Sequence, residues 1–329
     1  MTALPIALLS YSPIPFSMAV LFRIGARGSK LSLTQTEHVR AGLAAQLGVD
    51  AGALEVVPIT TSGDVIQDRR LIEAGGKGLF TKELDEALLD ERIDFAVHSL
   101  KDLPTRLPDG ITLACVPERE DPRDVFVSLR AKSLGDLPAG ANVGTASLRR
   151  QAQTLFARPD VGVVTLRGNV DTRLKKLEAG DADATFLALA GLKRLGLQGR
   201  ASSIVDPNDM PPAACQGALA ITARAEDKRV LDALFPYEDP TARIEIEAER
   251  AFLESLDGSC RTAIGALARV SGDRMSFIGE ALTPDGTTRW RREEAVALGR
   301  DRIADARALA LHLGRAIRDE AGDALVMDT

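Results

Sequence analysis

The sequence predicts an α/β protein with two domains joined by hinge strands, followed by a small α+β domain. Short β-prone segments alternate with glycine-bearing turns and capped helices through the first two thirds of the chain. Two polar segments with proline, near 118–123 and 207–217, fit a chain that leaves one domain, builds a second and returns. After them the pattern changes to alternating strands with a hairpin turn at 284–286. The length of 329 residues also exceeds the usual size of one domain.

The composition argues against several classes of function. A net charge of −6 gives no overall basic field to attract a nucleic-acid backbone, and 4% aromatic residues leave few side chains for base stacking. The three cysteines, Cys115, Cys215 and Cys260, are dispersed, and an odd number cannot all pair internally. They favour a reducing cytoplasm and make a zinc site unexpected.

The first stretch, residues 1–18, is apolar but interrupted by three prolines, and it lacks a basic beginning. It therefore matches neither a signal peptide nor a membrane helix. We expect a disordered N-terminal extension.

The next residues form the first strand–turn–helix unit. A strand at 20–25 enters a turn with glycine at positions 25 and 28, and Ser29 is a suitable N-cap for the following helix. Free N–H groups at a helix start favour anions, and Arg27 and Ser29 add side-chain donors. The pattern predicts an anion-binding corner, although a plain connection with a surface arginine would look the same.

Two further strands are predicted at 54–59 and 111–116, with a glycine-rich segment at 75–80 and a helix capped by Thr81 between them. Two interpretations of the glycine-rich segment remain open. It is either a lid that brings Lys77 to a ligand or merely a flexible loop.

A polar turn at 98–104 follows the apolar strand 94–97. Open α/β sheets bind their ligands at such carboxyl ends of strands. Asp102 is the only carboxylate in the turn, and Lys101 lies beside it. The structural alternative is an aspartate that hydrogen-bonds its own backbone. His98 is a candidate for the residue that orients the turn.

Three successive strand-to-helix corners of the next block carry arginines. After a strand ending at 142–144, residues 145–147 cap a helix whose first turn contains Arg149 and Arg150. The helix dipole disfavours cations there unless an anion offsets them, so we expect a carboxylate or phosphate ligand. Surface arginines with local aspartate partners are the alternative. The other two corners follow predicted strands at 161–166 and 185–189. The charged run 118–124 is interpreted as a solvated crossing without chemistry.

The last third predicts the α+β domain. A helix at 241–256 precedes a tight polar loop in which Cys260 lies beside Arg261, a neighbour that favours the thiolate. Cys115, in an apolar strand, is expected to be inert, and Cys215 is left open. The remaining elements are strands at 264–270, 275–282 and 288–295 and a helix at 303–318.

Segments along most of the chain resemble those of the hydroxymethylbilane synthase family, also called porphobilinogen deaminases. Each segment alone is a weak signal, but their order and spacing are specific. They are residues 23–29, 76–80, 98–104, 118–124, 144–151, 166–170 and 190–196, with 261–265 keeping the register after Cys260.

The resemblance implies two periplasmic-binding-protein-like α/β domains joined by hinge strands, and a C-terminal α+β domain with a three-stranded antiparallel sheet and helices. It implies that four porphobilinogen molecules are joined head to tail on an enzyme-bound dipyrromethane cofactor with release of ammonia, and that hydrolysis frees hydroxymethylbilane. Cys260 maps to the cysteine that anchors the cofactor through a thioether, and Asp102 maps to the catalytic aspartate. The expected domains are 19–117 with 218–238, then 118–217, then 239–329.

By the same resemblance, further residues bind the cofactor, bind the substrate or lie on an active-site loop. The cofactor set is Ser99, Lys101, Thr145, Ser147, Arg149, Arg150 and Arg173; the substrate set is Arg27, Ser29, Arg167 and Arg194; and the loop residues are Lys77 and Phe80. The chain departs from the family at Cys215 and Ser259, where glycine is usual.

The expected partner is the substrate porphobilinogen, with no nucleic acid, membrane or metal, and the expected state is a cytoplasmic monomer. A non-catalytic binding protein with two similar lobes is the competing hypothesis. Such a protein would need the clamp but neither Asp102 nor a modified Cys260.

Overall fold

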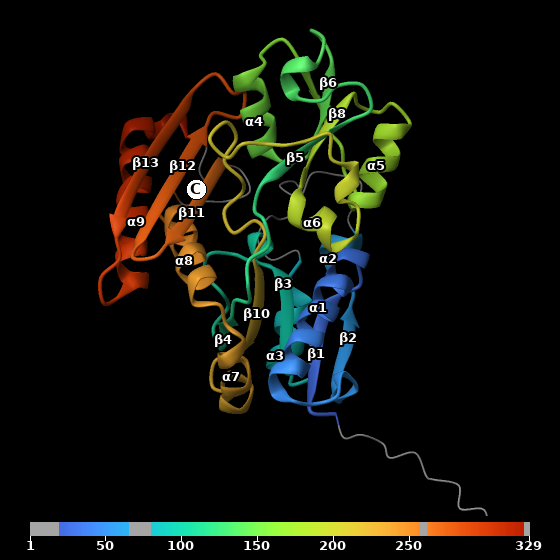
Figure 1. Ribbon diagram of the computed structural model, residues 1–329, viewed down its shortest axis with the longest axis vertical. Helices are drawn as coiled ribbons and strands as arrows, with labels where there is room; N and C mark the ends of the chain where they lie inside the picture. Colours follow the sequence, from blue (N-terminus) through green and yellow to red (C-terminus); the bar gives the residue numbers. More distant parts are fainter. Residues whose placement is uncertain (1–19, 66–79, 257–261, 326–329) are drawn as a thin grey trace, which may run out of the picture.

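The computed structural model describes residues 20–65, 80–256 and 262–325, which form three units with one β-sheet each (Figure 1). Two five-stranded mixed sheets belong to the first and second units, and a three-stranded antiparallel sheet belongs to the third. The second and third units lie side by side at one end of the molecule, and the first unit forms the other end (Figure 1). The expected fold class is confirmed.

The first unit has the strand order β2-β1-β3-β10-β4. Its strands are β1 (Phe22–Arg27), β2 (Leu54–Ile59), β3 (Phe95–Ser99), β4 (Ile111–Cys115) and β10 (Leu219–Arg224), and its helices are α1 (Lys30–Leu47), α2 (Ser62–Val65), α3 (Lys82–Leu89) and α7 (Lys228–Leu234). β1 pairs in parallel with β2 and β3, whereas β10 returns from the second unit and pairs antiparallel with β3 and β4. β3 is therefore the central strand of the sheet.

The second unit has the strand order β7-β6-β8-β5-β9. Its strands are β5 (Asp124–Ser128), β6 (Asn142–Gly144), β7 (Gly162–Val164), β8 (Ala184–Ala188) and β9 (Ser203–Ile204), and its helices are α4 (Leu148–Ala157), α5 (Val170–Glu178) and α6 (Leu189–Arg194). β6 runs parallel to β7 and β8, and β5 runs antiparallel to β8 and β9. Each of the first two sheets thus contains an interior strand, β10 or β5, that enters from the other unit.

The third unit packs two helices against its sheet. Its elements are α8 (Pro240–Ser255), β11 (Ala263–Ser271), β12 (Arg274–Leu282), β13 (Arg289–Ala297) and α9 (Arg302–Ala321). Phe252 of α8 and Phe277 of β12 meet with ring centroids 5.3 Å apart. The largest hydrophobic cluster joins these elements to Leu100 and Leu103 of the first unit. This shared core fixes the third unit to the turn that carries Asp102.

The two crossings between the first and second units lie against each other. Gly217 has a φ of +90°, and a Cβ atom there would come within 2.1 Å of the Glu120 carbonyl oxygen, so glycine is required on both counts. Arg119 is also buried, and its Nη1 donates to Glu249 Oε1 of α8 at 2.8 Å. The run 118–124 is a crossing between the two units, as predicted, but the prediction that it is a solvated face is wrong for Arg119.

Side-chain caps explain where several helices begin. Ser29, Ser147 and Asn169 each accept a hydrogen bond from the backbone N–H three residues further on. The predicted caps at Ser29 and Ser147 are confirmed. Thr81 precedes α3 but makes no such bond, so the prediction that it caps this helix is wrong.

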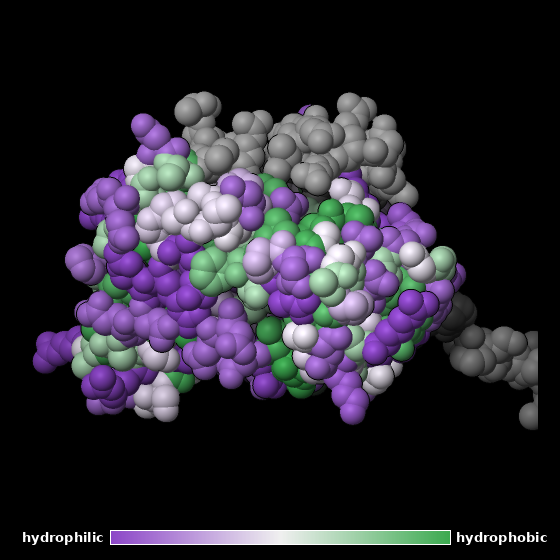
Figure 2. Space-filling model, turned by 90° about the horizontal axis from the view of Figure 1, so that it is seen from above, coloured by the Kyte–Doolittle hydropathy of each residue, from purple (hydrophilic) through white to green (hydrophobic). Residues whose placement is uncertain are grey.

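The end of the molecule formed by the second and third units has a mainly hydrophilic surface. Figure 2 shows hydrophobic residues there in separate groups among hydrophilic ones. Large exposed hydrophobic side chains, such as Leu129 and Phe235, belong to different units. None of the helices in the described ranges is long and apolar enough to span a bilayer.

Candidate active site

Asp102 lies where the central strand of the first unit ends. β3 continues into the short 3-10 turn η3 (Leu100–Asp102), in which Lys101 and Asp102 are exposed. Leu100 and Leu103 on either side are buried in the core and hold the turn in place. Within the described residues the Asp102 carboxylate makes no hydrogen bond, to its own backbone or elsewhere. It is therefore available to a ligand.

Lys101 connects this turn to the hinge. Its Nζ donates to Oε1 of Gln216 at 3.3 Å. Desolvation by the surrounding protein lowers the pKa of Lys101 to about 8, with Asp102 opposing the shift and Arg150 adding to it. Lys101 as a residue is exposed, so solvent weakens these effects. The interactions nevertheless place Lys101, Asp102 and Arg150 in one electrostatic environment.

Asp124, the first residue of β5, neutralises the arginines of α4. Arg149 Nη1 donates to Asp124 Oδ2 and Arg150 Nη2 donates to Oδ1, both at 2.8 Å, and all three side chains are at least 93% buried. Burial alone would raise the pKa of Asp124, but the two guanidinium groups hold it well below its usual range. The anion required at this helix start is therefore part of the chain. The expectation that a ligand must supply it is wrong.

Gln216 extends this cluster across the hinge. Its buried Nε2 donates to Asp124 Oδ1 at 2.8 Å and to the Pro122 carbonyl at 2.7 Å, while its Oε1 accepts from Lys101. A continuous chain of hydrogen bonds thus joins the first unit to the second. Sequence reasoning missed Gln216 and Asp124. The helix-dipole argument could have found Asp124, had it been applied to carboxylates within the chain.

The same network reaches the third unit. Arg149 Nη1 donates to Gln153 Oε1 at 2.9 Å, and Gln153 Nε2 donates to Glu280 Oε1 of β12 at 2.7 Å. Burial raises the pKa of Glu280 above its ordinary value. The orientation of α4 is therefore fixed by contacts with both neighbouring units.

Arg173 and Arg167 add cations near Asp102. The pKa of Arg173 is lowered to about 10, first by desolvation and then by Arg150, with Asp102 opposing and Arg167 contributing. Arg173 Nε donates to the Gly168 carbonyl at 2.8 Å. Arg167 Nη1 is buried and has no hydrogen-bond partner among the residues that the structure describes. A buried donor without a partner is unfavourable unless a ligand supplies an acceptor.

Arg27, the last residue of β1, lies beside Phe80. The Arg27 guanidinium lies 4.1 Å from the centroid of the Phe80 ring, a cation–π contact. Ser29 caps α1 through its hydroxyl. His98 is buried and shares a hydrogen bond of 3.0 Å with Thr222 of β10. This hydrogen bond ties His98 to the neighbouring strand, and the hypothesis that His98 orients the Asp102 turn stays a prediction.

The remaining predicted polar residues have partners within the protein. Thr145 Oγ1 accepts the Ser147 N–H at 3.1 Å, and Ser99 Oγ accepts from Gln35 Nε2 at 2.9 Å. Arg194 Nη2 donates to the hinge carbonyl of Gly217 at 2.8 Å. Desolvation lowers the pKa of Arg194 to about 10.

Two predicted residues, Cys260 and Lys77, lie outside the described residues. Burial raises the pKa of the Cys115 thiol to about 12, and burial with a nearby glutamate raises that of Cys215 strongly, so neither thiol favours the reactive thiolate. Where side chains are described, no group of three or more histidine, cysteine or acidic residues could hold a metal ion.

The arrangement suits a ligand with several carboxylates. Lys101, Arg150, Arg167 and Arg173 interact with one another or with Asp102, which is the only one of these five that could face a cationic centre. The unpartnered Arg167 donor fits a ligand carboxylate, because guanidinium groups bind carboxylates through paired N–H groups. A dipyrromethane, with its acidic side chains, fits this donor set.

The fold and the site together define a two-lobed α/β protein in which several cationic side chains lie near the carboxylate of Asp102. Two family models match the chain: "Porphobilinogen deaminase, dipyromethane cofactor binding domain" over residues 22–232 and "Porphobilinogen deaminase, C-terminal domain" over residues 243–319. The chain belongs to the porphobilinogen deaminase family.

Curated relatives agree over nearly the full length. The porphobilinogen deaminase of Caulobacter vibrioides is 57% identical over 316 residues, which cover 93% of this chain and 97% of the relative. That of Phenylobacterium zucineum is 54% identical over 314 residues, covering 93% and 98%. Among solved structures, the methionine-binding protein MetQ aligns with 68% of this chain and 91% of its own at a TM-score of 0.43 and 13% identity. The fold class is assigned from the strand order and pairing of the three sheets, not from this alignment.

Proposed function

We propose that Asp102 is the catalytic carboxylate of this enzyme and that Cys260 anchors its dipyrromethane. Family membership makes the chain a transferase of tetrapyrrole biosynthesis, a hydroxymethylbilane synthase that condenses porphobilinogen. The observation that carries the assignment of Asp102 is its carboxylate, which has no hydrogen bond within the described residues and lies in the field of several cations.

When bound, the dipyrromethane would supply the terminal pyrrole to which the first porphobilinogen is joined. Asp102 stabilises the positive charge that develops on the substrate's pyrrole nitrogen as ammonia leaves, and it helps to remove the proton displaced by the new bond. A preorganised charge of this kind contributes about 3–4 kcal/mol of transition-state stabilisation. The Asp102 turn is held between the buried residues Leu100 and Leu103, so the carboxylate does not reorganise during the reaction.

The cationic residues hold the acidic arms of the pyrroles. Arg167, with an unpartnered buried donor, and Arg173 are the direct carboxylate ligands. Arg149 and Arg150 are already paired with Asp124, so their part is to maintain a positive potential around the ligand. Lys101, Ser99, Thr145 and Ser147 complete the cofactor set, and Arg27, Ser29 and Arg194 the substrate set. Phe80 and Lys77 belong to the active-site loop.

The test of Asp102 is the variant Asp102→Asn. We expect an intact fold and a bound cofactor, but a turnover at least about a hundredfold lower, because the stabilising charge is gone. Ammonia release from porphobilinogen measures turnover, and intact mass measures the cofactor. Asp109→Asn, at an exposed aspartate of the same connection, is the matched control and should keep normal activity. Normal turnover in Asp102→Asn would remove this residue from the mechanism.

The thioether anchor is tested by mass. The wild-type protein should be heavier than its sequence by one dipyrromethane, and Cys260→Ser should have the mass of the bare chain. Cys115→Ser and Cys215→Ser should retain the extra mass, since both thiols are buried and protonated. A bare chain in fully active wild-type protein would contradict the assignment. It would favour the competing hypothesis of a non-catalytic binding protein.

We also propose that the enzyme is a cytoplasmic monomer that binds neither nucleic acid nor membranes. The net charge of −6 supports this, as do the separate hydrophobic groups on the one face that Figure 2 shows. Size-exclusion chromatography with light scattering should give the mass of one chain, about 35.1 kDa. A stable mass of twice that value would contradict the proposal.

A further inference from the structure

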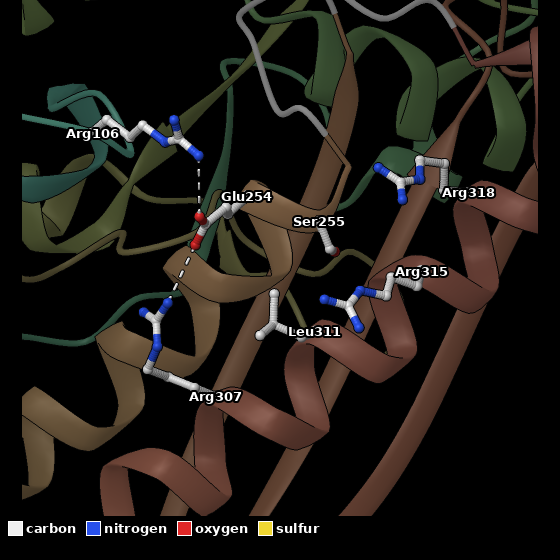
Figure 3. A pocket seen from close by; sticks show the side chains of 7 residues that line it. All are labelled: Arg106, Glu254, Ser255, Arg307, Leu311, Arg315 and Arg318. Atoms are coloured by element: carbon white, nitrogen blue, oxygen red, sulfur yellow. Dashed lines mark hydrogen bonds and ion pairs between the residues drawn. The ribbon is translucent and has the colours of Figure 1, made fainter.

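A cavity of about 320 Å³ lies outside the set of residues described above (Figure 3). It is bordered by α8, by α9 and by the segment that follows the Asp102 turn. Its lining residues are Arg106, Glu254, Ser255, Arg307, Leu311, Arg315 and Arg318. Four of the seven are arginines, and one is acidic.

Three of these arginines lie on one face of α9. Arg307, Leu311, Arg315 and Arg318 are separated by four, four and three residues, the spacing that brings helical side chains to the same side. Figure 3 shows Arg315 and Arg318 extending toward the space that Glu254 borders on the opposite side. α8 and α9 are in close contact beside it, because a Cβ atom at position 314 would lie within 1.7 Å of a serine hydroxyl of α8. The two helices are therefore held together here, while Arg106 and Arg315 at the border of the pocket are exposed to solvent.

The charges of the lining residues do not balance. Glu254 pairs with Arg307 at 3.2 Å and with Arg106 at 3.8 Å, and Arg307 also pairs with Glu247 of α8 at 2.9 Å, so both guanidinium groups at this end have carboxylate partners. Arg315 makes no hydrogen bond or ion pair with the described residues. A concentration of positive charge in a cavity of a chain whose net charge is −6 focuses a local field that attracts anions.

We propose that this cavity binds a small molecule with at least two anionic groups, either carboxylates or phosphates. Guanidinium groups present paired donors that match both oxyanions. The volume, equal to that of about ten water molecules, exceeds what one carboxylate or phosphate group fills. A tricarboxylate or an inorganic pyrophosphate has the size and charge required. This site goes beyond the proposed function, because none of its lining residues belongs to the catalytic or ligand-binding set.

A ligand here would connect the first unit to the third. Arg106 lies four residues after Asp102, and Arg250 of α8 donates to the Thr105 carbonyl at 2.7 Å. Ser255 is the last residue of α8, five residues before Cys260 in sequence. An anion that bridges Arg106 and the arginines of α9 would therefore hold together the two elements that lead to these positions.

The experiment is calorimetric titration of the holoenzyme with inorganic pyrophosphate and, separately, with citrate, at constant ionic strength. The wild type should bind at least one of them saturably, and Arg315→Glu should bind it at least about tenfold more weakly, because the charge at position 315 is reversed. Arg300→Glu, at an exposed arginine outside the cavity, is the matched control and should bind as the wild type does. The two titrants distinguish a phosphate site from a carboxylate site.

Three results would overturn the proposal. They are the absence of saturable binding of both titrants, equal affinity in Arg315→Glu and wild type, and loss of binding in Arg167→Gln with retention in Arg315→Glu. The last result would assign the anion to the proposed catalytic site instead. None of these readouts depends on turnover, so the cavity and the proposed function can fail independently.

Discussion

Replacing Asp124 by asparagine tests the buried charge cluster at the hinge. Asp124 is 1% exposed and accepts bonds of 2.8 Å from Arg149, Arg150 and Gln216. Asparagine has nearly the same shape but no charge, so Asp124→Asn leaves two buried guanidinium groups without a counter-charge. Breaking a buried ion pair in this way costs about 3–5 kcal/mol, a large part of the roughly 5–15 kcal/mol that stabilises a typical domain.

Urea unfolding followed by circular dichroism measures this loss. The matched control is Asp121→Asn, because Asp121 pairs with Arg123 in the same crossing but the arginine is 41% exposed. An exposed pair is worth about 0–1 kcal/mol, so the control should be nearly neutral. The pKa of Asp124 lies well below its usual range, so this carboxylate is ionised in the folded and unfolded states from pH 5 to pH 8. The difference in unfolding free energy between the two variants should therefore be constant over that range. A loss below about 1 kcal/mol in Asp124→Asn, or equal losses in both variants, would refute the reasoning.

Three further predictions follow from burial and backbone geometry. Burial lowers the pKa of His98 from 6.5 to about 4, so the free energy of unfolding falls by about 3 kcal/mol as the pH decreases through that range. His98→Gln should remove this part of the pH dependence of stability, measured by urea midpoints at pH 7 and pH 4.5. An unchanged dependence would contradict the prediction. Gly217→Ala should lower the stability by more than about 2 kcal/mol, because its Cβ would meet the Glu120 carbonyl. Gly180→Ala, with a similar φ of +85° but open space around the Cβ, should lower it by about 1 kcal/mol. Equal shifts in the thermal midpoint would exclude the steric explanation. Gln216→Leu should retain the fold but lower the stability by about 1–3 kcal/mol and also lower turnover, since it breaks the series of hydrogen bonds across the hinge. Normal stability and turnover would show that these hydrogen bonds are dispensable.

Local patterns predicted most of the elements. Alternation and turn residues located the three long strands of the third unit to within a residue or two, and they located its hairpin turn. Helix starts at Ser29 and Ser147 followed from capping, which acts over three residues. The failure at Thr81 has the same origin, because capping depends on backbone angles that residue type alone does not fix. The strand β7 is shorter than its apolar segment, because its partner β6 offers only three residues for pairing.

The sequence by itself determined the order of strands and helices, the position of Asp102 in an exposed turn, and the need for an anion near Arg149 and Arg150. Periodicity, capping and the helix dipole are short-range effects, so residues close in the chain reveal them. Only the tertiary structure decided that Asp124 supplies this anion and that Gln216 joins it to Lys101. These partners are 25 to 115 residues apart, and the sheets and crossings that bring them together bury the charges, which makes pairing within the chain obligatory.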